Sequence, residues 1–326
     1  MIDQNWQPQC SLEALRRRAQ LFADIRAFFA ERGVLEVDTP ILSQGSISDP
    51  HIEVMTSIYT GPLAPQGLTL YLQTSPEFAM KRLLAAGSGP IYQLGKVFRN
   101  EEAGRRHNSE FCMLEWYRPS LDHHQLMDEI ADLLVAVAGM DRSRIEKLSY
   151  LAAFERSLGI NPHRASLAEL QALAQQHAGY GEVEEDRDTL LNLLVSFVIE
   201  PSLGTEGPCF LYDYPASQAA LARTAEDEHG HQVACRFELF IKGVELANGY
   251  FELTDAEEQR RRLLADGETR RALGRPYNNP DLRLADALAA GLPDCAGVAL
   301  GVDRLLMVIL DAKDISQVMP FTLARA

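Results

Sequence analysis

The chain has 326 residues, of which 46% are hydrophobic and 24% are charged, as expected of a globular protein with a sizeable core. Its 46 acidic side chains outnumber the 31 basic ones and leave a net charge of −15. Proteins that hold nucleic acid through its phosphates usually carry an excess of lysine and arginine. The charge balance therefore argues against DNA or tRNA as a partner.

The five cysteines form no CxxC pair, which indicates reduced thiols and argues against a disulfide framework or a zinc site built on cysteine. No apolar run approaches the ~18 residues of a membrane span, and the N-terminus lacks the apolar region of a secretion signal. We therefore expect a soluble, cytoplasmic protein with no membrane partner.

The hydrophobic pattern predicts a first helix, capped by Ser11 and ended by Gly33, and then a group of strands. A mostly helical block follows at about 122–200, and a second group of strands leads to the C-terminal helices. The strands are predicted at about 34–37, 51–55, 69–73, 91–99, 110–118, 209–213, 232–241, 244–251 and 295–301, and the later helices at about 254–272, at 281–290 and from Val302. Because this order lacks regular β–α–β alternation, it favours an α+β fold with a mostly antiparallel sheet flanked by helices. We expect one domain over residues 1–326, with the helical block as an insertion.

Residues 98–117, FRNEEAGRRHNSEFCMLEWY, concentrate charged side chains between two predicted strands. Alternate residues of a strand face opposite sides, so the pattern predicts one polar face and one apolar face. The polar face would carry Arg99, Glu101, Phe111, Glu115 and Tyr117, and the apolar face Cys112, Leu114 and Trp116. A loop at 102–110 adds arginines and a histidine that suit a bound anion. An exposed, ion-paired hairpin is the alternative.

Residues 236–255, RFELFIKGVELANGYFELTD, predict a second hairpin with a two-residue turn at Lys242-Gly243. Phe240 would then pair with Glu245, and Glu238 would lie diagonal to Glu245 on the same face. Two carboxylates at that separation suit Mg²⁺, and a solvated acidic edge is the alternative. The outgoing strand would show Asn248, Tyr250 and Glu252 on one face, which suits a cationic ligand.

Two junctions between elements complete the candidates. In GVALGVDRLLMVIL (297–310) a strand runs into a helix, and Arg304 falls in the first turn, where the helix dipole attracts anions. Ser75-Pro76-Glu77 predicts a helix start with Ser75 as its cap. Glu77 is explained equally well as part of that start and as a ligand for an amine.

Three of these segments resemble the motifs of a known family. GVLEVDTPIL (33–42), residues 98–117 and GVALGVDR (297–304) are similar, in order, to motifs 1, 2 and 3 of class II aminoacyl-tRNA synthetases. Within that family, the lysyl-tRNA synthetase core is most similar to three further segments of this chain: SPEFAMKRLL, RFELFIKGVELANGYFELTDA and PDCAGVALGVDRLLM. Only about thirty residues precede motif 1, so no OB-fold anticodon-binding domain is expected. In this the chain resembles the stand-alone paralogues, the elongation factor P–(R)-β-lysine ligases, in which a lysine of that factor replaces tRNA as acceptor.

The resemblance implies ATP and Mg²⁺ as cofactors, with Arg99 and Arg304 as catalytic residues. The implied ATP site consists of Arg99, Glu101, Arg106, His107, Asn108, Phe111, Glu238, Glu245 and Arg304, with Glu238 and Glu245 carrying the metal ion. The implied substrate pocket consists of Ser75, Glu77, Glu115, Tyr117, Asn248, Tyr250, Glu252 and Ala299. The implied partners are elongation factor P, lysine or β-lysine, and a second copy of the chain that binds through Pro40 of motif 1 to form a homodimer.

Three departures from lysyl-tRNA synthetase argue against charging with α-lysine. Ala299 replaces a glycine, and SQGSISDPHIE (43–53) and YPASQAALA (214–222) replace synthetase segments; the last two match the paralogue. We therefore expect an ATP-dependent ligase that forms an adenylate of (R)-β-lysine and transfers it to the ε-amine of a lysine of elongation factor P. Direct tRNA charging is disfavoured by the low basic content. A non-catalytic regulatory role is disfavoured because the implied ATP-site residues are all present.

Overall fold

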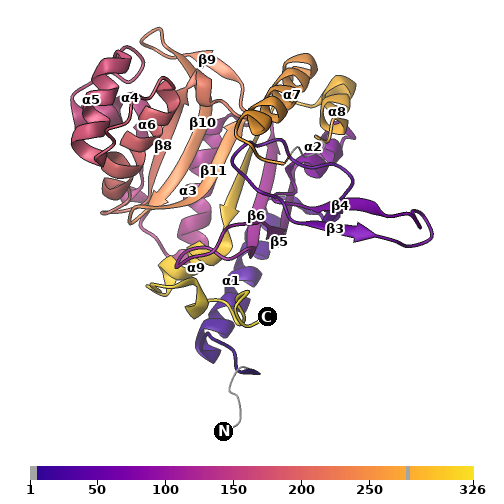
Figure 1. Ribbon diagram of the computed structural model, residues 1–326. Helices are drawn as coiled ribbons and strands as arrows, with labels where there is room; N and C mark the ends of the chain where they lie inside the picture. Colours follow the sequence, from indigo (N-terminus) through magenta and orange to yellow (C-terminus); the bar gives the residue numbers. More distant parts are fainter. Residues whose placement is uncertain (1–5, 277–279) are drawn as a thin grey trace. The chain divides into compact units, whose positions relative to one another are not determined.

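The computed structural model describes residues 6–276 and 280–326 and divides the chain into two compact units (Figure 1). Unit 1 combines the residues up to Ser120 with those from Thr254 onward, and unit 2 runs from Leu121 to Leu253. The expectation of one domain over the whole chain, with an insertion at about 122–200, stays a prediction. Among the described residues, no helix has the length and apolar character needed to cross a membrane.

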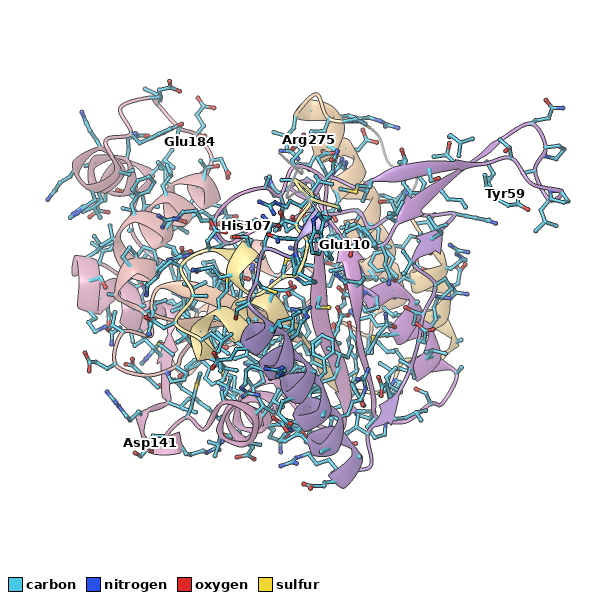
Figure 2. The ribbon with its side chains drawn as sticks, turned by 90° about the horizontal axis from the view of Figure 1, so that it is seen from below. Tyr59, His107, Glu110, Asp141, Glu184 and Arg275 are labelled. Carbon is cyan, nitrogen blue, oxygen red and sulfur yellow. The ribbon has the colours of Figure 1, made fainter. Side chains whose placement is uncertain are left out.

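Unit 1 is built on four neighbouring strands in the order β1-β5-β6-β12, with β1 parallel to β5 and the other pairs antiparallel. A small sheet in the order β2-β4-β3 adds a hairpin that extends away from the rest of the unit, with Tyr59 near its tip (Figures 1 and 2). The elements of unit 1 are α1 (Leu12–Glu31), β1 (Leu35–Glu36), β2 (Leu42–Ser43), β3 (Thr56–Tyr59), β4 (Leu68–Leu72), α2 (Glu77–Ala85), β5 (Ile91–Phe98), β6 (Glu110–Pro119), α7 (Ala256–Ala272), α8 (Arg283–Gly291), β12 (Cys295–Gly301), α9 (Val302–Ile309) and the short η6 (Ile315–Gln317).

The core of unit 1 lies between helix α1 and one face of this sheet. Ser11 caps α1 as predicted, since its side chain accepts a hydrogen bond from the Ala14 amide. Near the other end of α1, Phe29 stacks on Tyr92 of β5 with ring centroids 4.4 Å apart and meets Trp116 of β6 edge-on at 5.3 Å. Leu114 and Trp116 are fully buried, so the apolar face predicted for the second strand of this hairpin is confirmed.

Unit 2 contains four neighbouring strands in the order β11-β10-β8-β7, with β9 added beside β10. Helices α4, α5 and α6 contribute Tyr150, Phe154, Leu170 and Leu191 to an apolar cluster with β8 and β10, and helix α3 packs against β10 and β11 (Figure 1). The elements of unit 2 are α3 (His123–Ala138), η2 (Arg142–Arg144), β7 (Glu146–Ser149), α4 (Tyr150–Leu158), α5 (Leu167–Ala178), α6 (Arg187–Leu194), η3 (Val195–Ile199), η4 (Glu200–Ser202), β8 (Cys209–Pro215), η5 (Ala216–Gln218), β9 (Thr224–Glu226), β10 (Gln232–Ile241) and β11 (Val244–Phe251).

The predicted α+β class with a mostly antiparallel sheet is confirmed, and the strands predicted at 232–241, 244–251 and 295–301 have the observed bounds. The strand predicted at 51–55 is wrong, because this segment makes only an isolated bridge from Glu53 to Asn100. β7 was missed inside the helical block, since four residues between two helices leave little periodicity. All five cysteines are buried and free, as expected of reduced thiols.

Candidate active site

In unit 1 the β5–β6 hairpin places a cation beside an aromatic ring. β5 ends at Phe98, and Arg99 follows directly, with its guanidinium carbon 5.3 Å from the centroid of the Phe111 ring on β6. Arg99 also donates to Glu102 at 3.2 Å and to the Thr74 carbonyl at 3.4 Å. A guanidinium fixed in this way is oriented for an anion, and the ring offers a flat apolar surface.

The expected place of Glu101 on the polar strand face is wrong. The strand ends three residues earlier, and Glu101 is exposed in a turn with φ of 66°. The bridge between Asn100 and Glu53 redirects the chain here, so alternation no longer applies. Glu110, to which no role was assigned, forms an exposed ion pair with Lys96 at 2.8 Å.

The loop between the two strands brings His107 to Arg304. Gly104 and His107 exchange backbone hydrogen bonds of 3.2 Å, which closes a tight turn (His107 is labelled in Figure 2). Arg304, in the first turn of α9 as predicted, donates to His107 Nε2 at 2.5 Å and to the carbonyl of exposed Arg106 at 3.4 Å. Burial and the nearby positive charge of Arg304 lower the pKa of His107. The loop therefore carries the neutral imidazole of His107 beside the guanidinium of Arg304.

Asn108 is buried, and its side chain holds the loop in place. Its amide nitrogen donates to the Glu110 carbonyl at 2.7 Å, and its amide oxygen accepts from the Leu323 amide at 3.0 Å. Both ends of this side chain are thus bonded to backbone, which leaves the Asn108 main chain as the part that can meet a ligand.

Glu115 is a buried carboxylate on β6 that accepts two hydroxyl hydrogen bonds. Ser75 donates to one carboxylate oxygen and Tyr117 to the other, each at 2.7 Å, while Glu115 itself is only 2% exposed. Ser75 also accepts from the Glu77 amide at 3.0 Å, although α2 begins at Glu77 with Pro76 in the cap position, one residue later than predicted. We call Ser75, Glu115 and Tyr117 the Glu115 group.

Glu77 has a structural partner that sequence reasoning missed. Its carboxylate pairs at 2.6 Å with Lys81, whose side chain is fully buried one turn along α2. An (i, i+4) pair of acid and base is visible in sequence, but its burial is not.

Several small residues lie near Glu115 on its face of the sheet. Gln93 of β5 and Ala299 of β12 lie directly opposite Glu115 on either side. Met113 and Tyr117 share this face of β6 with Glu115, and the residues paired with them on β5 and β12 include Gly95, Gly297 and Gly301. On this face of β12, Ala299 lies between Gly297 and Gly301, so its methyl group is the only side chain that β12 adds at these three positions.

Two further polar groups near Ser75 were missed. Thr39 donates to the side chains of both Gln93, at 2.9 Å, and Gln73, at 3.4 Å. Gln73 Nε2 and Thr74 Oγ1 are buried and make no hydrogen bond within the residues that the structure describes. Buried polar groups normally have a partner, so these two fit a polar ligand in this part of unit 1. They were missed because neither residue type is charged.

In unit 2 the predicted hairpin turn is confirmed. Lys242 and Gly243 have φ of 52° and 66°, and Phe240 pairs with Glu245. A register shift after Leu239 inserts one extra residue on β11, so the residue opposite Glu238 is Asn248. This bulge, which sequence reasoning missed, keeps Glu245 on the face of β11 that also carries Asn248.

Glu238 belongs to a hydrogen-bond network centred on Arg236. Its carboxylate is ion-paired with Arg236 and accepts from the Tyr214 hydroxyl at 2.7 Å. Arg236 also donates to Asn248 at 3.2 Å, and Asn248 donates to the Tyr250 hydroxyl at 3.0 Å. Burial lowers the pKa of Arg236, but the charges of Glu238, Tyr250, Tyr214 and Glu245 together outweigh it and raise that pKa. Arg236 was missed, although strand alternation places it on the same face as Glu238.

The acidic side chains of this hairpin have a positive charge beside them that comes from the chain itself. Arg236 supplies this charge through its ion pair with Glu238. Glu252, at the end of the hairpin, is buried, and its backbone forms a bridge with Ala222.

The fold and these residues define a class of protein. A family model described as tRNA synthetases class II (D, K and N) matches residues 6–325, and the chain belongs to this family. Three curated relatives carry the name Elongation factor P–(R)-β-lysine ligase, and the chain is 52% identical to each of them. Those from Yersinia enterocolitica and Photorhabdus laumondii match over 324 residues, which is 99% of this chain and 98% of theirs. The one from Salmonella paratyphi B matches over 323 residues, which is 98% of both chains. Within the family, the chain belongs with these ligases.

Proposed function

We propose that this chain activates (R)-β-lysine with ATP and transfers the β-lysyl group to the ε-amine of a lysine on elongation factor P. The name of the relatives, at 52% identity over almost the whole chain, supports the substrates and the reaction. The observation on this chain that carries the proposal is the Glu115 group, a buried carboxylate that accepts from two hydroxyl groups.

The amino acid is recognised through its positive charges. A buried carboxylate is costly unless donors or a positive charge compensate it. Glu115 accepts from two hydroxyl groups, and in this proposal an ammonium group of β-lysine pairs with its carboxylate. Further contacts to the amino groups of β-lysine are assigned to Glu77, a residue of unit 1, and to Asn248, Tyr250 and Glu252, which are residues of unit 2. Ala299, opposite Glu115, adds a methyl group that disfavours α-lysine.

ATP is assigned to the residues around Arg99 and the 99–109 loop. Arg99 holds the α-phosphate and the amino-acid carboxylate, and Phe111 beneath it stacks on the adenine. The adenine edge is read by Glu101 and by the main chain of Asn108, whose side chain is already bonded. Arg106, His107 and Arg304, joined by hydrogen bonds, hold the outer phosphates.

In unit 2 the proposal assigns Mg²⁺ to Glu238 and Glu245. Carboxylate oxygens are the ligands that this ion prefers, and each oxygen of Glu238 keeps a second lone pair beyond its bond to Arg236 or Tyr214. When bound, the ion supplies positive charge to the phosphates.

The reaction proceeds in two displacements. A carboxylate oxygen of β-lysine attacks the α-phosphorus, the bond to the bridging oxygen breaks, and pyrophosphate leaves. Arg99 is positioned to neutralise charge on the α-phosphoryl oxygens, so catalysis rests on orientation and electrostatics. The lysine ε-amine of the acceptor then attacks the acyl carbon, AMP leaves, and the amine proton passes to solvent.

The proposal includes a homodimer formed through motif 1 in the cytoplasm. Pro40 is exposed and stands among exposed apolar side chains, since Leu35 is 56%, Ile41 42% and Leu42 45% accessible. Exposed apolar side chains of this kind suit burial against a second copy of the chain. No tRNA partner is included, because the net charge of −15 does not favour one.

The test uses the purified chain with ATP, Mg²⁺ and either (R)-β-lysine or α-lysine, together with elongation factor P or tRNA. We expect mass spectrometry to show one β-lysyl addition on elongation factor P, greater with (R)-β-lysine than with α-lysine. Addition to tRNA alone would overturn the proposal. Pyrophosphate exchange measured without any acceptor separates a failure of activation from a failure of transfer.

A further inference from the structure

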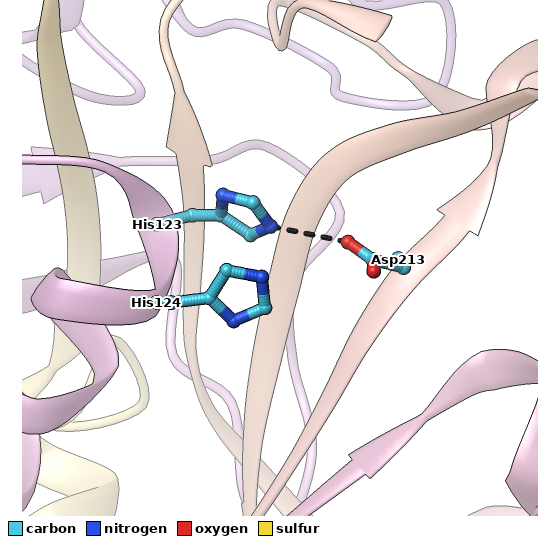
Figure 3. Close-up of side chains that lie close together, drawn as sticks. All are labelled: His123, His124 and Asp213. Atoms are coloured by element: carbon cyan, nitrogen blue, oxygen red, sulfur yellow. Dashed lines mark hydrogen bonds and ion pairs between the residues drawn. The ribbon is translucent and has the colours of Figure 1, made fainter. Parts of the chain in front are cut away.

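A cluster of two histidines and an aspartate lies in unit 2, among residues to which no catalytic role is assigned. Asp122 caps α3 and forms a capping box with Gln125, so the first two residues of the helix are His123 and His124. Figure 3 shows a ring nitrogen of each histidine directed toward the side on which Asp213 lies. His123 Nε2 lies 3.1 Å from an oxygen of Asp213, and the ring centroids of the two histidines are 4.1 Å apart.

The backbone of Asp213 is strained. Asp213 has φ of 59° within strand β8, in the left-handed region that residues with a side chain rarely adopt. The pairing of β8 with β10 is irregular at the same place, between Ala234 and Phe237. Strain and bulges of this kind are often found where a side chain is aimed at a functional partner.

A hydrogen bond alone does not account for the whole cluster. The bond between His123 and Asp213 uses one nitrogen and one oxygen. His123 is buried, and its Nδ1 makes no hydrogen bond within the residues that the structure describes. One donor atom from each of His123, His124 and Asp213 lies within 4.8 Å of the other two. The cluster thus brings together three ligand atoms from two separate elements.

The charges near the cluster favour a cation. The carboxylate of Asp213 is one negative charge near His124. Asp122 adds a second negative charge near His124. One nearby cation, Lys147, is turned to Asp128 at 2.9 Å and to the His124 carbonyl at 3.1 Å.

We propose that His123, His124 and Asp213 bind a divalent transition-metal ion of the zinc class, with water in the remaining position. Imidazole nitrogen and carboxylate oxygen are the ligands that such ions prefer. Bonds of ~2.0–2.1 Å in a tetrahedron place ligand atoms ~3.4 Å apart, so side-chain rotation closes the cluster from its present span. Nε2, the nitrogen of His123 that lies 3.1 Å from Asp213, is the one offered to the metal. The ion ties the first turn of α3 to β8.

A second cluster in unit 2 provides a matched control. His163, Asp227 and His231 also lie within 4.8 Å of one another. Asp227, however, already accepts from His231 Nδ1 at 3.0 Å and from the backbone amides of His229 and His231 at 2.9 and 2.7 Å. This carboxylate closes a turn, and we expect no metal there.

The test titrates the tag-free, EDTA-treated chain with Co²⁺, in excess Mg²⁺ and without ATP, and follows the visible absorption of tetrahedral cobalt. Zn²⁺ is then added as competitor, and metal content is measured by mass spectrometry. We expect one Zn²⁺ per chain, displacing Co²⁺. Asp213→Asn and His124→Gln should each weaken binding at least about tenfold, and His231→Gln should leave it unchanged.

Two results would overturn the proposal. One is the absence of stoichiometric binding at micromolar Zn²⁺, and the other is binding that survives both Asp213→Asn and His124→Gln. His124 is exposed, so its substitution tests the site even if the variant of the partly buried Asp213 fails to fold. Pyrophosphate exchange by His124→Gln should match the parent chain, which separates this site from the proposed ligase activity.

Discussion

The Glu115 group allows the proposed recognition of β-lysine to be tested with one isosteric change. Glu115→Gln keeps the shape of the side chain and removes its charge. The folded state exchanges two charge-assisted hydrogen bonds for neutral ones, and it is also relieved of burying a carboxylate that is 2% exposed. These effects oppose each other, so we expect the free energy of unfolding to change by no more than about 1–2 kcal/mol.

Recognition of the substrate should suffer much more. Truncating one partner of a buried charge pair costs about 2–5 kcal/mol, which corresponds to a loss of roughly 30-fold to several thousand-fold in kcat/KM. The assay is pyrophosphate exchange at varied (R)-β-lysine, with KM for ATP measured alongside. We expect the loss to appear for β-lysine and the KM for ATP to stay within about twofold, because the charge removed faces the amine.

Glu110→Gln is the matched control on the same strand. Its carboxylate is half exposed and pairs with Lys96 at the surface, where such pairs contribute at most about 1 kcal/mol. Parent-like kcat/KM for (R)-β-lysine in folded Glu115→Gln would refute the reasoning and make Glu115 a structural carboxylate. An equal loss in both variants would refute it too.

Three other predictions concern neighbouring residues. Arg99→Ala should abolish pyrophosphate exchange, because no other group is assigned to the α-phosphate, and retained exchange would contradict the two-step mechanism. Ala299→Gly removes the methyl group opposite Glu115 and should raise the rate with α-lysine relative to (R)-β-lysine by about tenfold. Competition between the two isomers measures this ratio, and an unchanged ratio would exclude Ala299 as a determinant of substrate choice. Burial and Arg304 lower the pKa of His107, and the phosphates of bound ATP should raise that pKa again. ATP should therefore bind with uptake of a proton near pH 6.5. Calorimetry in two buffers of different ionisation enthalpy measures this uptake, which should be lost in His107→Gln. Because the pKa of His107 is lower in the folded chain than in the unfolded chain, the unfolded chain binds the proton at a higher pH as the pH falls. The free energy that His107 contributes to folding is therefore present above pH 6.5 and is lost as the pH falls below it.

The parts of the fold that could be predicted are those fixed by local chemistry. Lys242-Gly243 determines a two-residue turn, and the turn sets the pairing of Phe240 with Glu245. Alternation along β6 separated Trp116 from Glu115 because that strand is regular throughout.

The features that were missed depend on distant residues. The end of β5 at Phe98 coincides with a bridge to Glu53, which no local pattern shows, and so Glu101 was misplaced. Ser75 meets Glu115 across 40 positions, and His123 meets Asp213 across 90. Arg236 is different, because its position in strand alternation with Glu238 was visible and only its role as a charge partner was overlooked.

The bulge in β11 has a consequence for how the length of this hairpin can vary. Glu245 and Asn248 are separated by an odd number of positions, and they share a face only because one extra residue stands between the paired positions. Deleting the extra residue of β11 would turn Glu245 to the opposite face of the sheet, although Glu245 itself would be unchanged. Substitutions in this hairpin can therefore accumulate far more readily than insertions or deletions. The exposed tip of the β3–β4 hairpin, around Leu63, has no such constraint and can lengthen or shorten freely.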